Sequence, residues 1–240
     1  MAKVQTAVAP VSHVGPDLRE EMFSLMLRHY RGMERDAFHA DLAEKDDVLL
    51  FRTGGRLIGF STIFCKRFPW LCDATFLFSG DTVVDQQWWG GSFLQMAFGR
   101  YVLSVKLRNL HRPVYWMLIS KAYKTYMMMR RNYPHSFPQR SQPTPEAVQA
   151  VLDGFYSWKY PGAFDRGSGL IRLDSGGYTV SSGLADPDPA AAADPDVRYF
   201  LERNPGWARG DELACLAEIR LRDYIPILLK YTPRYVRLHR

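Results

Sequence analysis

The stretch Val83-Val-Asp-Gln-Gln-Trp-Trp-Gly-Gly-Ser92 decides how the fold of this chain is interpreted. Residues 74–84, which lead into it, are rich in β-branched and aromatic side chains and predict a central strand. Residues 92–107, which follow, are strongly apolar and predict a helix. The stretch is therefore predicted to be a turn that leads from the end of a strand directly into a helix.

Such a turn is suited to binding an anion. The first N–H groups of a helix have no partner within the helix, and the helix dipole makes this end partly positive. Gly90 and Gly91 would allow the backbone to approach a ligand closely, which suits a diphosphate. The alternative is that the two glycines form a tight turn that binds no ligand.

The flanking segments predict the rest of the core, in which a Gly54-Gly55 turn would join the two arms of a β-hairpin. A hairpin makes its strands antiparallel, whereas strand–turn–helix units imply parallel neighbours. We therefore expect an α/β fold with a mixed, mostly antiparallel twisted sheet and flanking helices. The expected elements are helices over 17–33 (N-cap Asp17) and 35–44, the hairpin over 47–64, a strand over 114–119 and a helix over 120–131.

The last hundred residues predict an addition to this core. We divide the chain into a core, residues 1–139, and a C-terminal extension packed on it, residues 140–240. The elements expected in the extension are a helix over 145–155, paired segments 170–173 and 178–181, a surface loop over 183–196, a strand over 212–219 and a basic terminal helix.

Two motifs resemble the GNAT superfamily of N-acetyltransferases. The acyl-CoA-binding turn of that family has Gln or Arg, then Gly three residues later, then Gly or Ala two residues after that. Gln87-Trp-Trp-Gly90-Gly91-Ser92 matches the first two positions and has serine at the third. The family's last core helix often reads Ala-x-x-Leu-Tyr followed by Gly-Phe; Ala122-Tyr-Lys-Thr-Tyr126 matches both ends, and methionines replace the Gly-Phe. The resemblance covers residues 17–133.

The resemblance implies transfer of an acyl group from acyl-CoA, or from an acyl carrier protein, directly to an amine in a ternary complex. Val83, Val84 and Asp85 would pair with the pantetheine arm through backbone hydrogen bonds. The diphosphate would be held by Gln87, Trp88, Trp89, Gly90, Gly91 and Ser92. Tyr126 would protonate the departing thiolate, and Tyr126→Phe would then slow turnover without changing donor affinity. The alternative for Tyr126 is a helix tyrosine that packs against the sheet.

The acceptor must lose a proton. Asp81 is the candidate base, because a carboxylate among apolar strand residues is desolvated; the alternative is a structural aspartate that caps a loop. Candidates for the acceptor site are His29, Tyr30 and Arg31. The alternative is that they are ordinary surface or packing residues. The methionines 127–129, with Met96, Met117 and Phe98, would line either an acyl tunnel or the ordinary core.

Composition limits the partners. The net charge is +6, and residues 216–240 hold +4 of it, with six basic and two acidic side chains. This basic tail suits peripheral contact with a membrane surface or an acidic carrier protein, and its alternative is a docked terminal helix. The three cysteines lack the spacing of a zinc site or a disulfide framework. We expect a cytoplasmic protein with no metal, no membrane-spanning segment, no nucleic-acid partner, and a small-molecule or peptide amine as acceptor.

A non-catalytic module that binds CoA or a lipid is the alternative function. Ser92, the missing Gly-Phe and the C-terminal extension are compatible with it. An enzyme requires Tyr126 and one carboxylate within reach of a splayed strand end, with an open groove. In a module, Trp88, Trp89 or the tail would fill that groove.

Overall fold

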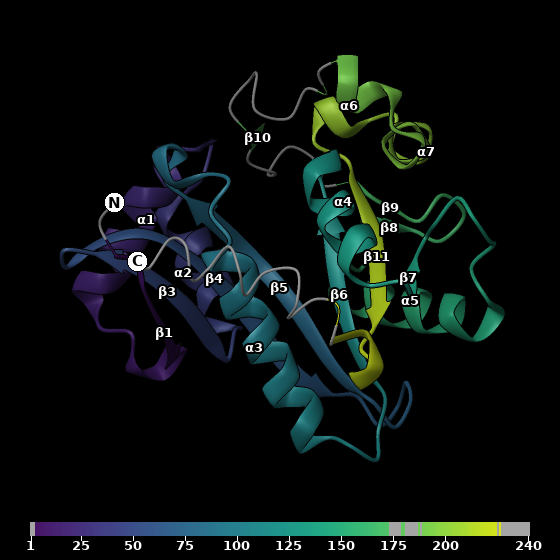
Figure 1. The fold of residues 1–240 in the computed structure, drawn as a ribbon, viewed down its shortest axis with the longest axis horizontal. Coiled ribbons are helices and arrows are strands. Elements are labelled where there is room, and N and C mark those ends of the chain that lie inside the picture. The colour runs from purple at the N-terminus through teal and green to yellow at the C-terminus, as the bar shows by residue number, and fades with distance from the viewer. Residues whose placement is uncertain (1–2, 173–178, 181–186, 188, 225, 227–240) are drawn as a thin grey trace.

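The computed structural model of the chain describes residues 3–172, 179–180, 187, 189–224 and 226. Its main sheet has nine strands, eight of them in the order β1-β3-β4-β5-β6-β11-β9-β8, with β7 also paired to β11 (Figure 1). The strands are β1 (Gln5–Pro10), β3 (Asp47–Thr53), β4 (Arg56–Arg67), β5 (Thr75–Val84), β6 (Val114–Ser120), β7 (Ser136–Phe137), β8 (Phe164–Asp165), β9 (Leu170–Ile171) and β11 (Glu212–Glu218). The predicted mixed, mostly antiparallel sheet is confirmed: β5 and β6 are parallel, and the other described pairs are antiparallel.

Helices cover both faces of the sheet. Alternation along each strand sends neighbouring side chains to opposite faces, so Leu49 packs in the cluster that includes α3 and α4, while Leu50 packs against α1 and α2. The helix α5 covers the second face further along, over Phe76 and Phe78. The helices are α1 (Pro16–Leu27), α2 (Arg35–Ala43), α3 (Phe93–Arg108), α4 (Tyr123–Asn132), α5 (Glu146–Lys159), α6 (Pro189–Ala193) and α7 (Pro195–Arg203).

Strands β5 and β6 separate partway along their length. They pair from Thr75 to Phe78 on β5 and from Val114 to Met117 on β6. Beyond these residues β5 pairs only with β4, and β6 only with β11. The two strands therefore enclose a V-shaped opening within the sheet.

A bulge shapes the β5 side of the opening. The register between β4 and β5 shifts between Ser61 and Ile63, which places Gly80 and Asp81 in an irregular segment. A Cβ on Gly80 would lie 2.5 Å from Thr62 Oγ1 and 2.6 Å from Lys45 Cε. Glycine is required here because the chain passes so closely over these two side chains.

The N-terminal predictions hold with one correction. The second helix, the hairpin with its Gly54-Gly55 turn, the central strand and the helix after it are confirmed. The first helix is shorter than predicted, and its N-cap is Gly15 rather than Asp17. Pro16 occupies the first helical position, where its missing N–H and fixed φ carry no penalty.

The C-terminal predictions need more correction. The strand at 212–219 is confirmed as β11, but residues 170–171 pair with β8 and β11, and β10 (Thr179–Val180) pairs with β2 (Tyr30–Arg31). The predicted pairing of 170–173 with 178–181 is therefore wrong. Within the loop predicted over 183–196, residues 189–193 are helical and residues 195–196 begin the helix 195–203, as alanine's high helix propensity and proline at a first helical position allow. Residues 183–186 and 188 of that loop lie outside the described residues. Most of the predicted terminal helix lies outside the described residues, and the division at residue 140 stays a prediction.

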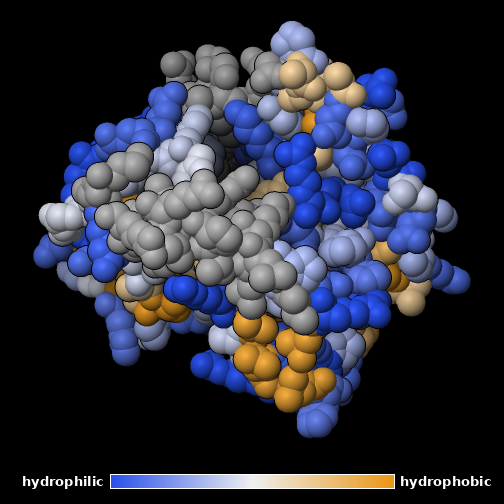
Figure 2. Space-filling model, viewed as in Figure 1, coloured by the Kyte–Doolittle hydropathy of each residue, from blue (hydrophilic) through white to orange (hydrophobic). Residues whose placement is uncertain are grey.

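On the face shown in Figure 2, the described residues are mostly hydrophilic, with small apolar patches. Leu107 and Leu110, at and just beyond the end of α3, are about half exposed. No helix among the described residues is both long and apolar enough to cross a membrane.

Candidate functional site

A cavity of about 500 Å³ occupies the opening between β5 and β6. Its walls come from β5 beyond Leu77, the turn that follows β5, the first half of α3, the end of β6, and α4. The cavity is also lined by residues of β2, of α2, of the C-terminal end of α5 and of the start of β11. The cavity thus joins the two faces of the sheet at the point where β5 and β6 separate.

The predicted turn lies at one end of this cavity. A short 3-10 helix, Gln86–Trp88, leads to Gly90 with φ of +80°, and Ser92 is the N-cap of α3. The N–H of Met96 donates to the Ser92 carbonyl at 2.9 Å, which is the first hydrogen bond of the helix. The preceding N–H groups have no partner within the helix. Gly90, Gly91 and Leu94 line the cavity, so this partly positive end of α3 borders it.

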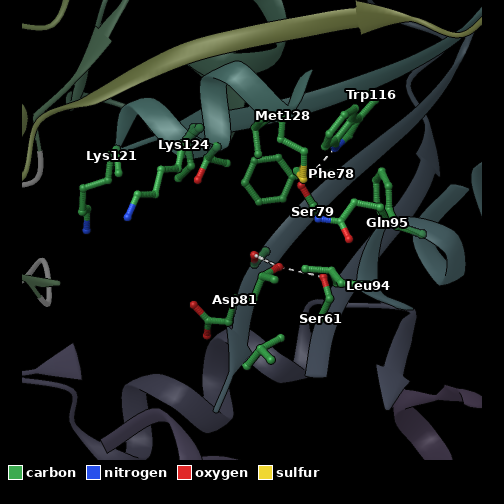
Figure 3. A pocket seen from close by; sticks show the side chains of 18 of the residues that line it. Ser61, Phe78, Ser79, Asp81, Leu94, Gln95, Trp116, Lys121, Lys124 and Met128 are labelled. Atoms are coloured by element: carbon green, nitrogen blue, oxygen red, sulfur yellow. Dashed lines mark hydrogen bonds between the residues drawn. The ribbon is translucent and has the colours of Figure 1, made fainter. Parts of the chain in front are cut away.

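Two lysines and a glutamine add polar groups to the walls. Lys121 and Lys124 point into the open space from the α4 side, facing Asp81 on β5 (Figure 3). The Lys124 ammonium lies 6.0 Å from the centre of the Trp89 ring. Gln95 on α3 also lines the cavity, and its side-chain oxygen is buried and accepts no hydrogen bond from the described residues.

The turn residues differ in their relation to the cavity. Val84, Trp88, Trp89, Gly90 and Gly91 line it, whereas Val83, Asp85, Gln87 and Ser92 do not. The Trp89 indole N–H donates to the Val84 carbonyl at 2.8 Å, which fixes the ring at the strand end. The described residues do not fill the groove, since the two tryptophans form part of its wall.

The side chain of Asp85 belongs to an ion cluster, and the backbone pairing with pantetheine predicted for Asp85 stays a prediction. Its carboxylate lies 2.5 Å from Arg56, 3.5 Å from Arg28 and 3.7 Å from His29, and the residue is buried. Val83 packs on the opposite face, against α1 and α2. Because strand side chains alternate, those of consecutive β5 residues cannot all face one cavity; the predicted pairing concerns the main chain and is not affected.

Carboxylates and tyrosines gather at the other end of the cavity. Asp81, Asp41 and Glu212 line it together with Tyr30 and Tyr160. Burial raises the pKa of Tyr30, and the charges of Asp81 and Glu212 raise it further. Burial also raises the pKa of Tyr160 well above its usual value, with Glu212, Asp41 and Asp81 adding to the effect. Both phenols therefore stay protonated at neutral pH.

Glu212 is the most buried of these carboxylates. Burial raises its pKa, and the ammonium of Lys121, 3.3 Å away, partly opposes this increase. The residue opens β11, directly beside the end of β6, because Leu213 pairs with Ser120. Glu212 and Asp81 thus stand on opposite arms of the V.

Tyr126 does not lie in the cavity. Its side chain is 1% exposed, and its hydroxyl donates to the Pro138 carbonyl at 3.1 Å. Its ring packs 5.5 Å from that of Phe200. Burial raises its pKa. These contacts favour the packing alternative over the predicted role as general acid, because the helix turns this side chain toward α7 and away from the strand opening.

Of the three residues predicted for the acceptor, Tyr30 lines the cavity, and its hydroxyl donates to the Thr82 carbonyl at 3.4 Å. His29 lies outside the cavity walls, beside Asp85, with its ring 6.4 Å from that of Trp89. The Arg31 side chain is outside the described part of the structure. Tyr30 is therefore the one of these three that borders the cavity among the side chains that the structure describes, and its role at the acceptor stays a prediction.

We expect the thiols to react slowly at neutral pH. Burial raises the pKa of Cys65 to about 11, with the charges of Asp46 and Asp47 adding to the effect, and burial also raises that of Cys72. At pH 8 about one Cys65 in a thousand is thiolate, so alkylation by iodoacetamide should be slow and should accelerate up to about pH 11. Site-resolved mass spectrometry measures this rate; a rate at Cys65 that levels off near pH 8 would contradict the assignment.

No group of three or more His, Cys, Asp or Glu side chains suited to a metal occurs among the residues that the structure describes. The predicted absence of a metal stays a prediction.

Sequence reasoning missed two residues on the β6 side, Glu212 and Tyr160. Glu212 and Tyr160 belong to the extension, far along the chain from the turn, and no local pattern connects them to it. Lys121 and Lys124 were not missed: the sequence indicates either that they attract the phosphates or that they belong to a solvated helix face.

The chain matches no family model and no curated protein. Among solved structures, it is similar to an IAA acetyltransferase from Bacillus cereus, with 11% identity over 90% of this chain and 100% of that one and a TM-score of 0.42. It is similar to the GNAT family N-acetyltransferase YhbS from Escherichia coli, solved in complex with CoA, with 12% identity over 55% of this chain and 69% of that one and a TM-score of 0.41. An acyl-CoA N-acyltransferase from Pseudomonas aeruginosa shares 12% identity over 61% of this chain and 94% of that one, with a TM-score of 0.40. These similarities are likenesses of fold, and at these identities and TM-scores they carry no conclusion about family or activity.

Proposed function

We propose that this protein is an N-acyltransferase that moves an acyl group from acyl-CoA directly to an amine. The observation that carries the proposal is the cavity itself, which joins the free N–H groups of a helix to a set of carboxylates through an unpaired strand edge. The N–H groups suit a diphosphate, and the unpaired strand edge suits an extended thioester tether. The carboxylates suit an amine that must lose a proton.

The donor end would hold the diphosphate. The N–H groups at the start of α3 are free to donate, and Gly90 and Gly91 let the ligand approach the backbone. Lys124 adds positive charge at the same end, beside the exposed ring of Trp89. The tether would then follow β5 from Val84 to Ser79, about 17 Å at the rise of an extended strand.

Gln95 would hold the tether. Its buried oxygen faces the cavity without a donor, and the amide N–H groups of pantetheine are donors of the required kind. We expect Gln95→Met, which keeps the volume but removes the acceptor, to weaken CoA binding by about tenfold, equivalent to one hydrogen bond of roughly 1.4 kcal/mol. Isothermal calorimetry measures the change. Gln142→Met, at an exposed position outside the cavity, is the matched control, and equal affinities for the two variants would refute the contact.

The acceptor end would perform the proton transfer. The amine nitrogen attacks the thioester carbonyl, Asp81 takes the proton released by the nitrogen, and the C–S bond breaks to release the CoA thiolate. Asp81 is suited to this because the β5 bulge directs it into the opening (Figure 3). Glu212, held by Lys121 on the opposite arm, would bind and orient the incoming amine.

Calorimetry with CoA, acetyl-CoA and phosphopantetheine tests the proposal. We expect CoA and acetyl-CoA to bind, and phosphopantetheine, which lacks the diphosphate, to bind more weakly. Tight binding of phosphopantetheine alone would instead favour an acyl carrier protein as donor. No binding by any of the three would refute the transferase assignment and leave a non-catalytic module. The contact of the basic tail with a membrane stays a prediction, because most of that segment lies outside the described residues.

A further inference from the structure

The cavity continues past the point where the tether would end. Trp116 lines this part of the cavity. It pairs with Leu77, in the segment where β5 and β6 are still hydrogen-bonded, one residue before the two strands separate. Phe98, one helical turn beyond Leu94 on α3, and Tyr133, directly after α4, line the same part. Their rings lie 4.7 Å and 5.1 Å from that of Trp116. The inner end of the cavity is thus closed by an aromatic wall of Phe98, Trp116 and Tyr133.

Two polar side chains in this inner part form hydrogen bonds within the protein. The Trp116 indole N–H donates to Ser79 Oγ at 3.0 Å, and the Asn132 side-chain nitrogen donates to the Met128 carbonyl at 2.7 Å. The aromatic wall therefore offers mainly ring surface. Met128 faces it from α4, close to Phe78 and Ser79 (Figure 3), and its flexible side chain adapts to what lies beside it.

We propose that this inner end is an acyl pocket that selects a thioester with an unbranched apolar chain longer than acetyl. The inference rests on the proposed function, since it takes the tether to end near Ser79. An acetyl group there would leave the ring surface without a partner, whereas a longer chain buries its methylenes against it. The aromatic wall sets the upper limit of chain length, and Met128 narrows the passage toward it.

A series of acyl-CoA thioesters tests the pocket. We expect the dissociation constant to fall by up to about fourfold per added methylene, from acetyl through butyryl and hexanoyl, the factor expected for complete burial. Affinity should stop rising where the chain meets the aromatic wall. Phe98→Ala, which opens that wall, should move the preferred length to longer chains, and Met128→Trp should move it to shorter ones.

Val102→Ala is the matched control. Val102 is a fully buried residue one turn further along α3, outside the cavity walls, so its truncation lowers stability without changing the preferred chain length. If Phe98→Ala does not fold, as circular dichroism would show, Met128→Trp still decides the question.

Two negative results are distinguishable. If CoA binds but affinity does not rise beyond acetyl-CoA, or if both cavity variants keep the chain preference of the original protein, the acyl pocket is refuted and the donor site stands. If neither CoA nor any thioester binds, the proposed function is refuted and the acyl pocket with it.

Discussion

Gly90→Glu is expected to abolish the binding of coenzyme A. The residue lies in the turn before α3, has φ of +80° and lines the cavity. A Cβ there meets no atom within 4 Å, so the new side chain has space beside the helix end, although the positive φ strains any residue other than glycine. Its carboxylate would occupy the partly positive site intended for the diphosphate and repel the ligand. We expect the dissociation constant measured by calorimetry to rise at least about a hundredfold, or roughly 2.8 kcal/mol.

The control for this variant is Gly90→Asn. Asparagine tolerates a positive φ better than most residues, so it introduces a side chain of similar size without a negative charge. We expect Gly90→Asn to bind CoA within a few-fold of the original protein. If Gly90→Glu binds CoA as tightly as Gly90→Asn does, the diphosphate lies elsewhere.

Asp81→Asn is expected to remove most of the transferase activity. Asparagine keeps the shape of the side chain but cannot accept the proton from the acceptor nitrogen. Loss of a general base lowers turnover by roughly 10² to 10⁴-fold. Because the diphosphate end of the cavity is unchanged, the dissociation constant for acyl-CoA should remain near its original value. Release of the CoA thiol, followed with a thiol reagent, measures turnover.

Asp73→Asn is the matched control for Asp81→Asn. Asp73 precedes β5 and is exposed, and it pairs with Arg67 and Arg112 outside the cavity. We expect it to retain normal turnover. If turnover in Asp81→Asn equals that of the control, the base is another group, and Glu212 on the opposite arm is the next to test.

The elements beside the turn were predictable because their signals are local. Gly54 and Gly55 have the positive φ values of a tight turn, and the apolar run after Ser92 forms α3 as its periodicity indicates. Gly90 and Gly91 line the cavity at a helix start, which a strand–glycine–helix sequence predicts.

The opposite wall of the site was not predictable because its contacts are between segments distant in sequence. Glu212 reaches the cavity only because β11 inserts beside β6, and the pairing of β9 with β11 overturned the hairpin predicted in the extension. Tyr126 is the opposite case, in which a local motif predicted a role that the distant contacts do not favour. Its motif suggested catalysis, but the packing of α4 against α7 decides its orientation, and the hydroxyl reaches the Pro138 carbonyl instead.

A crystal structure of this protein in complex with coenzyme A is the most direct test of the donor site. We expect diphosphate oxygens within about 2.7–3.2 Å of main-chain nitrogens at the start of α3, with the pantetheine arm along β5. Coenzyme A bound on another surface, with the cavity between β5 and β6 left vacant, would contradict the account.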